Sequence, residues 1–101
     1  MTTRTKNLVA AAEKVMLADP FLDDQEQARM IARTGAARAF RRASGLTQVE
    51  IGNAIGVAPS SVALWESGNR RPHGVRAVRW VRLLREIDPE LFALVVERHS
   101  S

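Results

Sequence analysis

Apolar residues recur at helical spacing along almost the whole chain, whereas the alternation typical of strands is nearly absent. A first helix is predicted over residues 5–18, with an apolar face made by Leu8, Ala12, Val15 and Met16. Asp19-Pro20 should end this helix, because the residue before a proline avoids the α region. The pattern therefore indicates an all-α protein.

A second helical segment should begin at Asp23 or Asp24, either of which is a good N-cap. It ends at Ser44-Gly45, and its inward positions are Ala28, Ile31, Ala36 and Phe40. Gly35 lies in the middle and costs about 1 kcal/mol relative to alanine. Two interpretations stay open, one continuous helix or two helices that meet at Gly35.

Two short helices joined by a tight glycine turn are predicted over residues 47–68. Thr47 and Glu50 form a capping box that begins the first helix, and Gly56 ends it after the apolar positions Val49, Ile51 and Ile55. Pro59 suits the first position of the second helix, where a missing N–H costs nothing. This arrangement is typical of a helix-turn-helix.

The second short helix, which ends at Ser67-Gly68, should bury one side and leave the other free. The buried side is made by Val57, Val62 and Trp65, and the free side by Ser60, Ser61, Ala63 and Leu64. The free side is small and uncharged, so it can approach base edges in a major groove. We therefore expect residues 59–67 to be a recognition helix.

Two further helices complete the prediction. The first covers residues 73–86, with His73 as its N-cap, and buries Val78, either Val81 or Trp80, Leu84 and Ile87. Asp88-Pro89 then begins a last helix with the apolar stripe Leu91, Phe92, Val95 and Val96. We divide the chain into an N-terminal helical extension (1–27), a helix-turn-helix domain (28–87) and a C-terminal helix with a tail (88–101).

The distribution of charge along the chain indicates that the partner is a polyanion. The net charge is +4, and two stretches without any acid contain five arginines (29–42) and six arginines (70–85). They flank the predicted helix-turn-helix, as expected for binding to nucleic acid. The other interpretation is a set of solvated helix faces. We favour this second interpretation for the stripe Arg76, Arg79, Arg82 and Arg85.

The spacing of several short motifs resembles the phage-repressor and Cro-like helix-turn-helix family over about residues 36–86. The motifs are Gly45-Leu46-Thr47-Gln48, Ile55-Gly56-Val57, Ser61-Val62, Trp65-Glu66-Ser67-Gly68 and Arg71-Pro72. The resemblance implies a lambda-repressor-like domain of five helices, the third of which reads DNA. To this all-α domain the chain adds an extra N-terminal helix and a C-terminal helix.

The resemblance also implies which residues contact DNA. Gln48 would hold a phosphate, although it could instead only cap its own helix. The positions nearest the bases are Pro59, Ser60 and Ser61, followed by Ala63 and Leu64, and the loop that grips the backbone is Asn69, Arg70 and Arg71. Arg38 and Arg42 are equally open to phosphate contact or to solvent. Arg41 and Glu66 match a pair that forms a buried salt bridge in some members.

Two positions depart from the family pattern. Ala58 replaces the usual N-cap serine, and Pro59 stands where many relatives have a long polar side chain. Because a proline ring cannot hydrogen-bond a base, direct readout should be modest and DNA shape should contribute. Weak specificity per monomer favours a homodimer, for which the last helix is the preferred surface and the first helix the rival.

These features predict a sequence-specific DNA-binding transcriptional regulator, a repressor, whose partner is double-stranded DNA. The alternatives are the antitoxin of a toxin–antitoxin pair, which would bind a toxin, and a helix-turn-helix interaction module that does not bind DNA. No set of side chains resembles a catalytic or metal site, so we expect no enzyme activity and no cofactor. The absence of cysteine, of a secretory signal and of an apolar run long enough to span a bilayer favours a cytoplasmic location, in a bacterial or phage-infected cell.

Overall fold

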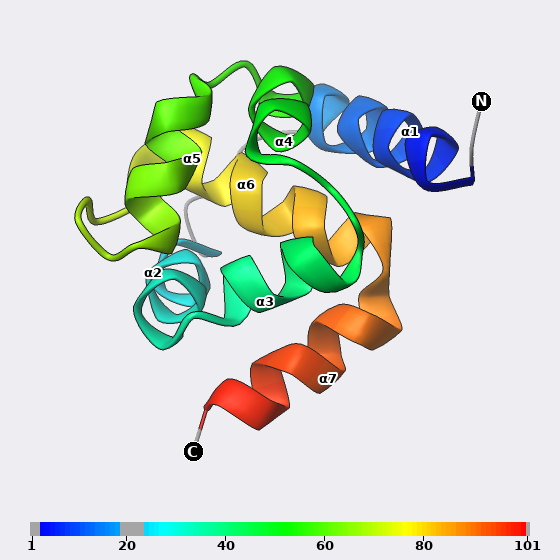
Figure 1. Cartoon of the computed structure of the whole chain (residues 1–101). Coiled ribbons are helices and arrows are strands. Elements are labelled where there is room, and N and C mark those ends of the chain that lie inside the picture. The colour runs from blue at the N-terminus through cyan, green and yellow to red at the C-terminus, as the bar shows by residue number, and fades with distance from the viewer. Residues whose placement is uncertain (1–2, 19–23, 101) are drawn as a thin grey trace.

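A computed structural model describes residues 3–18 and 24–100, and in these residues the chain forms helices and no strand (Figure 1). The helices are α1 (Thr3–Leu17), α2 (Gln25–Thr34), α3 (Ala36–Ala43), α4 (Gln48–Ile55), α5 (Pro59–Glu66), α6 (Gly74–Ile87) and α7 (Pro89–His99). The all-α prediction is therefore confirmed. None of these described helices has the length and the apolar character that a membrane span requires.

Helix α6 is the central element of the fold, and α1, α2, α3, α4 and α7 all pack against it (Figure 1). Half of its residues are buried: Ala77, Val78, Trp80, Val81, Leu83, Leu84 and Ile87. A helix that is apolar around most of its circumference belongs inside a core. Both Trp80 and Val81 are buried, so the choice between them that the sequence left open was unnecessary.

Gly35 divides the second predicted segment into α2 and α3. Its φ of 83° lies in the left-handed region, which glycine adopts without steric cost and which ends a helix. The four inward positions predicted for this segment (Ala28, Ile31, Ala36 and Phe40) are all buried. The turn at Gly35 lets α2 and α3 bury these faces in one core although the helices point in different directions.

Helix α1 contributes Leu8, Ala11 and Val15 to the same core. Ala12 is only partly buried, and the expectation that Met16 points inward is wrong, because 40% of Met16 is exposed. The stripe that faces α6 follows positions 8, 11 and 15, and Met16 lies about 100° away from Val15 around the helix. The expected stop at Asp19-Pro20 lies outside the described residues.

The apolar stripe of α7 is used inside the protomer. Phe92 and Val95 are buried, Leu91 and Val96 are partly buried, and α7 packs on α3 and α6. The rings of Phe40 and Phe92 meet edge to face, with centroids 5.8 Å apart. Phe92 and Val95 are therefore used in the core of the protomer, whereas a helix pair made with the partly exposed Leu91 and Val96 stays a prediction.

A cluster of charges joins α2 to α6. The Asp24 carboxylate accepts hydrogen bonds from Arg82 Nε at 2.8 Å and from Arg85 Nη2 at 2.9 Å, and Arg85 Nη1 also donates to Gln27 Oε1 at 2.8 Å. The Asp24 side chain is 17% exposed. The charge pattern alone suggested that Arg82 and Arg85 belong to a solvated stripe. The structure shows instead that both donate hydrogen bonds to Asp24. Asp24 is the N-cap residue of α2, but its carboxylate makes no cap hydrogen bond to the backbone of that helix. The carboxylate binds the two arginines instead.

Replacing Asp24 by asparagine should destabilise the protein in a pH-dependent way. Hydrogen bonds from Arg85 and then from Arg82 outweigh burial and hold the pKa of Asp24 below its ordinary value of 3.8. Because the folded pKa is depressed, the stabilisation is complete above pH 4–5 and is lost as the pH falls through the folded pKa. We expect Asp24→Asn to lower the free energy of unfolding by about 2 kcal/mol at pH 7, and by progressively less below pH 4.

Urea denaturation of both proteins at a series of pH values measures this difference. The control is Glu90→Gln, which removes an exposed carboxylate in the first turn of α7. A difference between Asp24→Asn and wild type that stays constant down to the acid transition would contradict the linkage.

Candidate nucleic-acid interface

Helix α4 begins with the predicted capping box. The N–H of Glu50 donates to Thr47 Oγ1 at 3.0 Å, and the N–H of Thr47 donates to Glu50 Oε1 at 2.9 Å. Two backbone N–H groups that a helix start leaves unpaired are therefore satisfied reciprocally. Ile51 and Ile55 are buried as expected, but Val49 is 52% exposed, because only part of this short helix faces the core.

The turn between α4 and α5 depends on two glycines. Gly56 ends α4 in the left-handed conformation, with φ of 72°, as the sequence predicted. Gly52 lies one turn earlier, where a Cβ atom would stand 2.6 Å from the carbonyl oxygen of Val57. The backbone of the turn thus passes against the bare backbone of α4, and the sequence analysis did not single out this contact.

Helix α5 is held to the core by one side that begins after its first turn. Val62 and Trp65 are buried, and the rings of Trp65 and Trp80 lie 5.0 Å apart between centroids. Pro59 occupies the first turn, as predicted, and the Ala58 carbonyl accepts from the N–H of Ser61 at 2.9 Å. The packing therefore fixes α5 from Val62 onward and leaves its first three residues at the surface.

A buried ion pair ties α3 to the end of α5. Arg41 Nε donates to Glu66 Oε2 at 2.7 Å, and Arg41 Nη2 donates to Glu66 Oε1 at 3.0 Å. The two side chains are only 12% and 3% exposed. Arg41 Nη1 also donates to the Leu46 carbonyl at 2.8 Å, so this one guanidinium fixes α5 and the loop before α4 together.

Gln48, the residue expected to hold a phosphate, is part of this network. Its Nε2 donates to Glu66 Oε1 at 3.1 Å, across from α4 to α5. The amide has a second N–H and a carbonyl oxygen, and the residue is only half-buried. Gln48 is therefore oriented by Glu66 at the junction of the two helices, with hydrogen-bonding groups to spare.

The predicted base-reading residues lie together on the first turns of α5. Ser60 is exposed, and Pro59, Ser61, Ala63 and Leu64 are half-buried. The first turn of a helix also presents backbone N–H groups and the positive end of the helix dipole. The surface thus offers two hydroxyl groups, small apolar groups and a positive helix end, but no long side chain of its own.

The loop after α5 supplies the long side chains. The N–H groups of Asn69 and Arg70 both donate to the Leu64 carbonyl, at 3.0 and 3.1 Å, and fold the loop back on α5. Arg70 Nη1 then donates to Ser61 Oγ at 3.2 Å. The loop therefore brings a guanidinium to the reading face of the helix, where the sequence alone placed two serines, an alanine and a leucine.

The far end of this loop is anchored by α2. His73 is the N-cap residue of α6, as expected, but its side chain makes no cap hydrogen bond in the described part of the chain. Instead the N–H of Gly74 donates to Gln25 Oε1 at 2.8 Å. This long-range cap replaces the local one, and it fixes where the loop joins α6.

The family comparison agrees with this geometry. A family model described as Helix-turn-helix matches residues 38–92, which is more than half of the chain and extends from α3 into the first turn of α7. The chain belongs to this helix-turn-helix family. Neither a curated protein nor a solved structure gives a significant match.

Membership of the helix-turn-helix family confirms the Cro-like resemblance and makes the chain, in general terms, a DNA-binding regulator. Counted from α3, where the match begins, the third helix is α5, and α7 is the fifth. Helices α1 and α2 precede the matched region.

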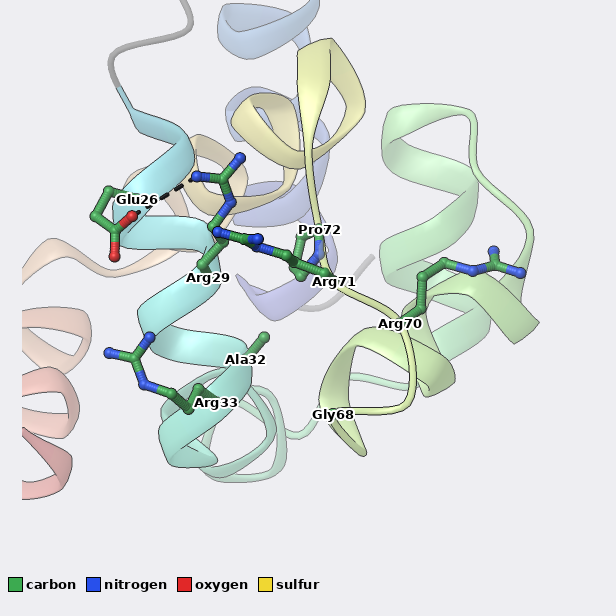
Figure 2. Close-up of a pocket in the computed structure, with 8 residues that line it drawn as sticks. All are labelled: Glu26, Arg29, Ala32, Arg33, Gly68, Arg70, Arg71 and Pro72. Atoms are coloured by element: carbon green, nitrogen blue, oxygen red, sulfur yellow. Dashed lines mark ion pairs between the residues drawn. The ribbon is translucent and has the colours of Figure 1, made fainter.

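Two sets of arginines lie outside the helix-turn-helix itself. Arg38 and Arg42 are exposed on α3, one turn apart, on the side away from buried Phe40. Arg29 and Arg33 on α2 line a cleft together with Arg71 of the loop (Figure 2). The sequence analysis did not single out this second set, although Arg29 and Arg33 belong to the acid-free stretch 29–42.

Proposed function

We propose that the protein is a sequence-specific transcriptional regulator that represses by occupying its DNA site with α5 in the major groove. The observation that carries this proposal is the reading face of α5, where Ser60 is exposed and Arg70 is hydrogen-bonded to Ser61 beside it. A guanidinium is the side chain best suited to guanine edges and phosphates. The buried pair of Arg41 and Glu66 supports the proposal, because it holds this helix rigidly to the domain.

The proposal assigns two kinds of contact. Ser60, Ser61, Ala63 and Leu64 would meet base edges, and Pro59 would only shape the start of the helix. The phosphates on either side of the groove would be met by Gln48, Asn69, Arg70 and Arg71, with Arg38 and Arg42 as further phosphate contacts. Phosphate contacts provide affinity and base contacts provide specificity.

A homodimer on a two-fold site is the second part of the proposal. Serine and alanine read few base edges, so one α5 discriminates weakly among sequences. Two copies on a symmetric site would multiply that discrimination. A regulator of this kind would act on DNA in the cytoplasm of a bacterial or phage-infected cell.

Replacing Arg70 by glutamine should weaken DNA binding and its dependence on salt. Glutamine keeps a hydrogen-bond donor near Ser61 but removes the charge. We expect the affinity for a random 24-bp duplex to fall roughly tenfold at low salt, and the slope of log K against log salt to become shallower by about 0.9. Fluorescence anisotropy of a labelled duplex across a salt series measures both quantities.

The matched control is Arg98→Gln, which removes an exposed arginine from the last turn of α7. Its affinity and slope should stay close to those of wild type. If wild type itself binds no duplex at low salt, the DNA-binding proposal fails and a helix-turn-helix used for protein interaction takes its place.

A further inference from the structure

A cleft with basic walls lies between α2 and the loop that follows α5 (Figure 2). Its volume is about 440 Å³, and Arg29, Arg33, Arg70 and Arg71 line it, although the guanidinium of Arg70 points away from α2 (Figure 2). Among the described residues that line it, Glu26 is the one acid. Three guanidinium groups against one carboxylate leave a net positive charge in a concave site, where low-dielectric walls strengthen the attraction of an anion.

The charge on Arg29 is only weakly compensated inside the protein. Its Nη1 lies 3.7 Å from Glu26 Oε2, and its Nη2 lies 3.5 Å from Gln25 Oε1, both longer than a good hydrogen bond. Its Nε is buried and has no hydrogen-bond partner among the described residues. A buried polar atom without a partner costs free energy unless a ligand or water satisfies it, so Arg29 is ready to receive an acceptor.

Glu26 is a replaceable partner for Arg29. Its side chain is 75% exposed, and an exposed ion pair at 3.7 Å contributes little free energy. An anion in the cleft would therefore displace the carboxylate at small cost. The arrangement differs from the pair of Arg41 and Glu66, in which both partners are buried and every distance is short.

The two loop arginines point in opposite directions. In Figure 2 Arg71 extends toward Arg29 on α2, whereas Arg70 extends toward α4 and α5 on the other side of the loop. One side of the loop therefore belongs to the reading face and the other to the cleft. A DNA backbone that crosses the loop would pass from one guanidinium to the next.

We propose that this cleft is a phosphate site for the DNA backbone, built by Arg29 and Arg71 with Arg33 at its border, beside the footprint of the helix-turn-helix. The inference rests on the proposed function. It assigns to α2, which precedes the region that the family shares, a direct part in DNA affinity. The site carries no sequence information, because a phosphate is the same at every step of the duplex.

Charge substitutions of opposite sign test the site. Arg29→Gln should make the slope of log K against log salt shallower by about 0.9, since one phosphate contact is lost. Arg33→Gln, at an exposed position with little risk to the fold, should weaken binding in the same direction but less. Glu26→Gln should instead raise the affinity for a random 24-bp duplex roughly threefold, because it removes the competing carboxylate. Arg98→Gln again serves as the control.

The double variant Arg29→Gln/Arg70→Gln shows whether Arg29 and Arg70 contact different phosphates. For separate contacts the changes in log K add, and the slope of Arg29→Gln/Arg70→Gln becomes shallower by about 1.8. A slope in the double variant equal to that of Arg70→Gln alone would overturn a separate site.

A second readout distinguishes DNA from a free anion. The Nε–H resonance of Arg29 in an NMR spectrum of the whole chain should shift when duplex is added, and Arg29→Gln should remove that peak without altering the melting temperature by more than a few degrees. Inorganic phosphate should cause a much smaller shift at matched ionic strength. A phosphate-induced shift combined with unchanged salt slopes in Arg29→Gln would overturn the DNA assignment in favour of a small anion.

These outcomes separate the site from the proposed function. If wild type binds duplex, but the salt slope of Arg29→Gln and the affinity of Glu26→Gln both equal those of wild type, only the cleft is refuted. If wild type binds no duplex, the proposed function fails and the cleft fails with it.

Discussion

Replacing Glu66 by glutamine should lower the free energy of unfolding by about 3–5 kcal/mol, a large part of the stability of so small a domain. The substitution keeps the shape of the side chain, so no cavity forms. It leaves the Arg41 guanidinium, which is 12% exposed, without a counter-charge, and an uncompensated buried charge is costly. Urea denaturation followed by circular dichroism measures the change.

The double variant Arg41→Met/Glu66→Met separates the charge from the rest of the network. Removing both charges should recover a large part of the loss, because a buried ion pair gives little more stability than well-packed apolar residues. The recovery should be incomplete, since the Leu46 carbonyl and the Gln48 amide also lose a partner. If the losses of Arg41→Met alone and of Glu66→Met alone add up to the loss of the double variant, this interpretation of the pair is contradicted.

The helix-turn-helix was predictable because its signals are local. The capping box of Thr47 and Glu50, the left-handed Gly56 and Pro59 in the first turn each act within a few residues, and each has the expected geometry. Local conformational preference and spacing determine such features almost independently of the rest of the chain. The framework of α4 and α5 was therefore available from the sequence alone.

The features that the sequence did not reveal depend on contacts between distant segments. Asp24 meets Arg82 and Arg85 across about sixty positions of the chain, and the Gln25 side chain, rather than that of His73, accepts from the first N–H of α6. A pattern of charges on one helix cannot show that another helix covers it. The same holds for the cleft, whose walls come from α2 and from the loop after α5.

The apolar stripe of α7 was predicted as a dimer surface, although part of it packs inside the protomer. Its apolar pattern was correctly recognised, but an apolar face can equally cover its own core or another copy, and periodicity does not distinguish these two uses. Packing on α3 and α6 decides the question for Phe92 and Val95. The dimer proposal thus stands on the modest reading face of α5, without support from this stripe.

Gly52→Val should be the most damaging substitution within the turn, with a loss of about 3–4 kcal/mol. An ideal Cβ at this position lies 2.6 Å from the Val57 carbonyl oxygen and 3.3 Å from the nitrogen of Pro59. Both are backbone atoms, so only a movement of α5 relative to α4 relieves the clash. Overpacking usually costs 1–3 kcal/mol and more where the backbone must move. No rotamer moves Cβ itself, and the two γ-methyl groups of valine add further crowding.

Gly52→Ala shows how the loss of stability depends on the size of the side chain at position 52, and Asn53→Val is the control. Alanine brings the same Cβ against the Val57 carbonyl oxygen but has no γ-methyl groups, and it gains about 1 kcal/mol of helix propensity, so its net effect should be well below that of valine. Asn53 is exposed on the same helix, so valine there should change stability by less than 1 kcal/mol. DNA affinity, measured where every variant is folded, should fall at least tenfold for Gly52→Val and stay unchanged for Asn53→Val. Equal stability of the two valine variants would show that α4 and α5 do not need this close approach.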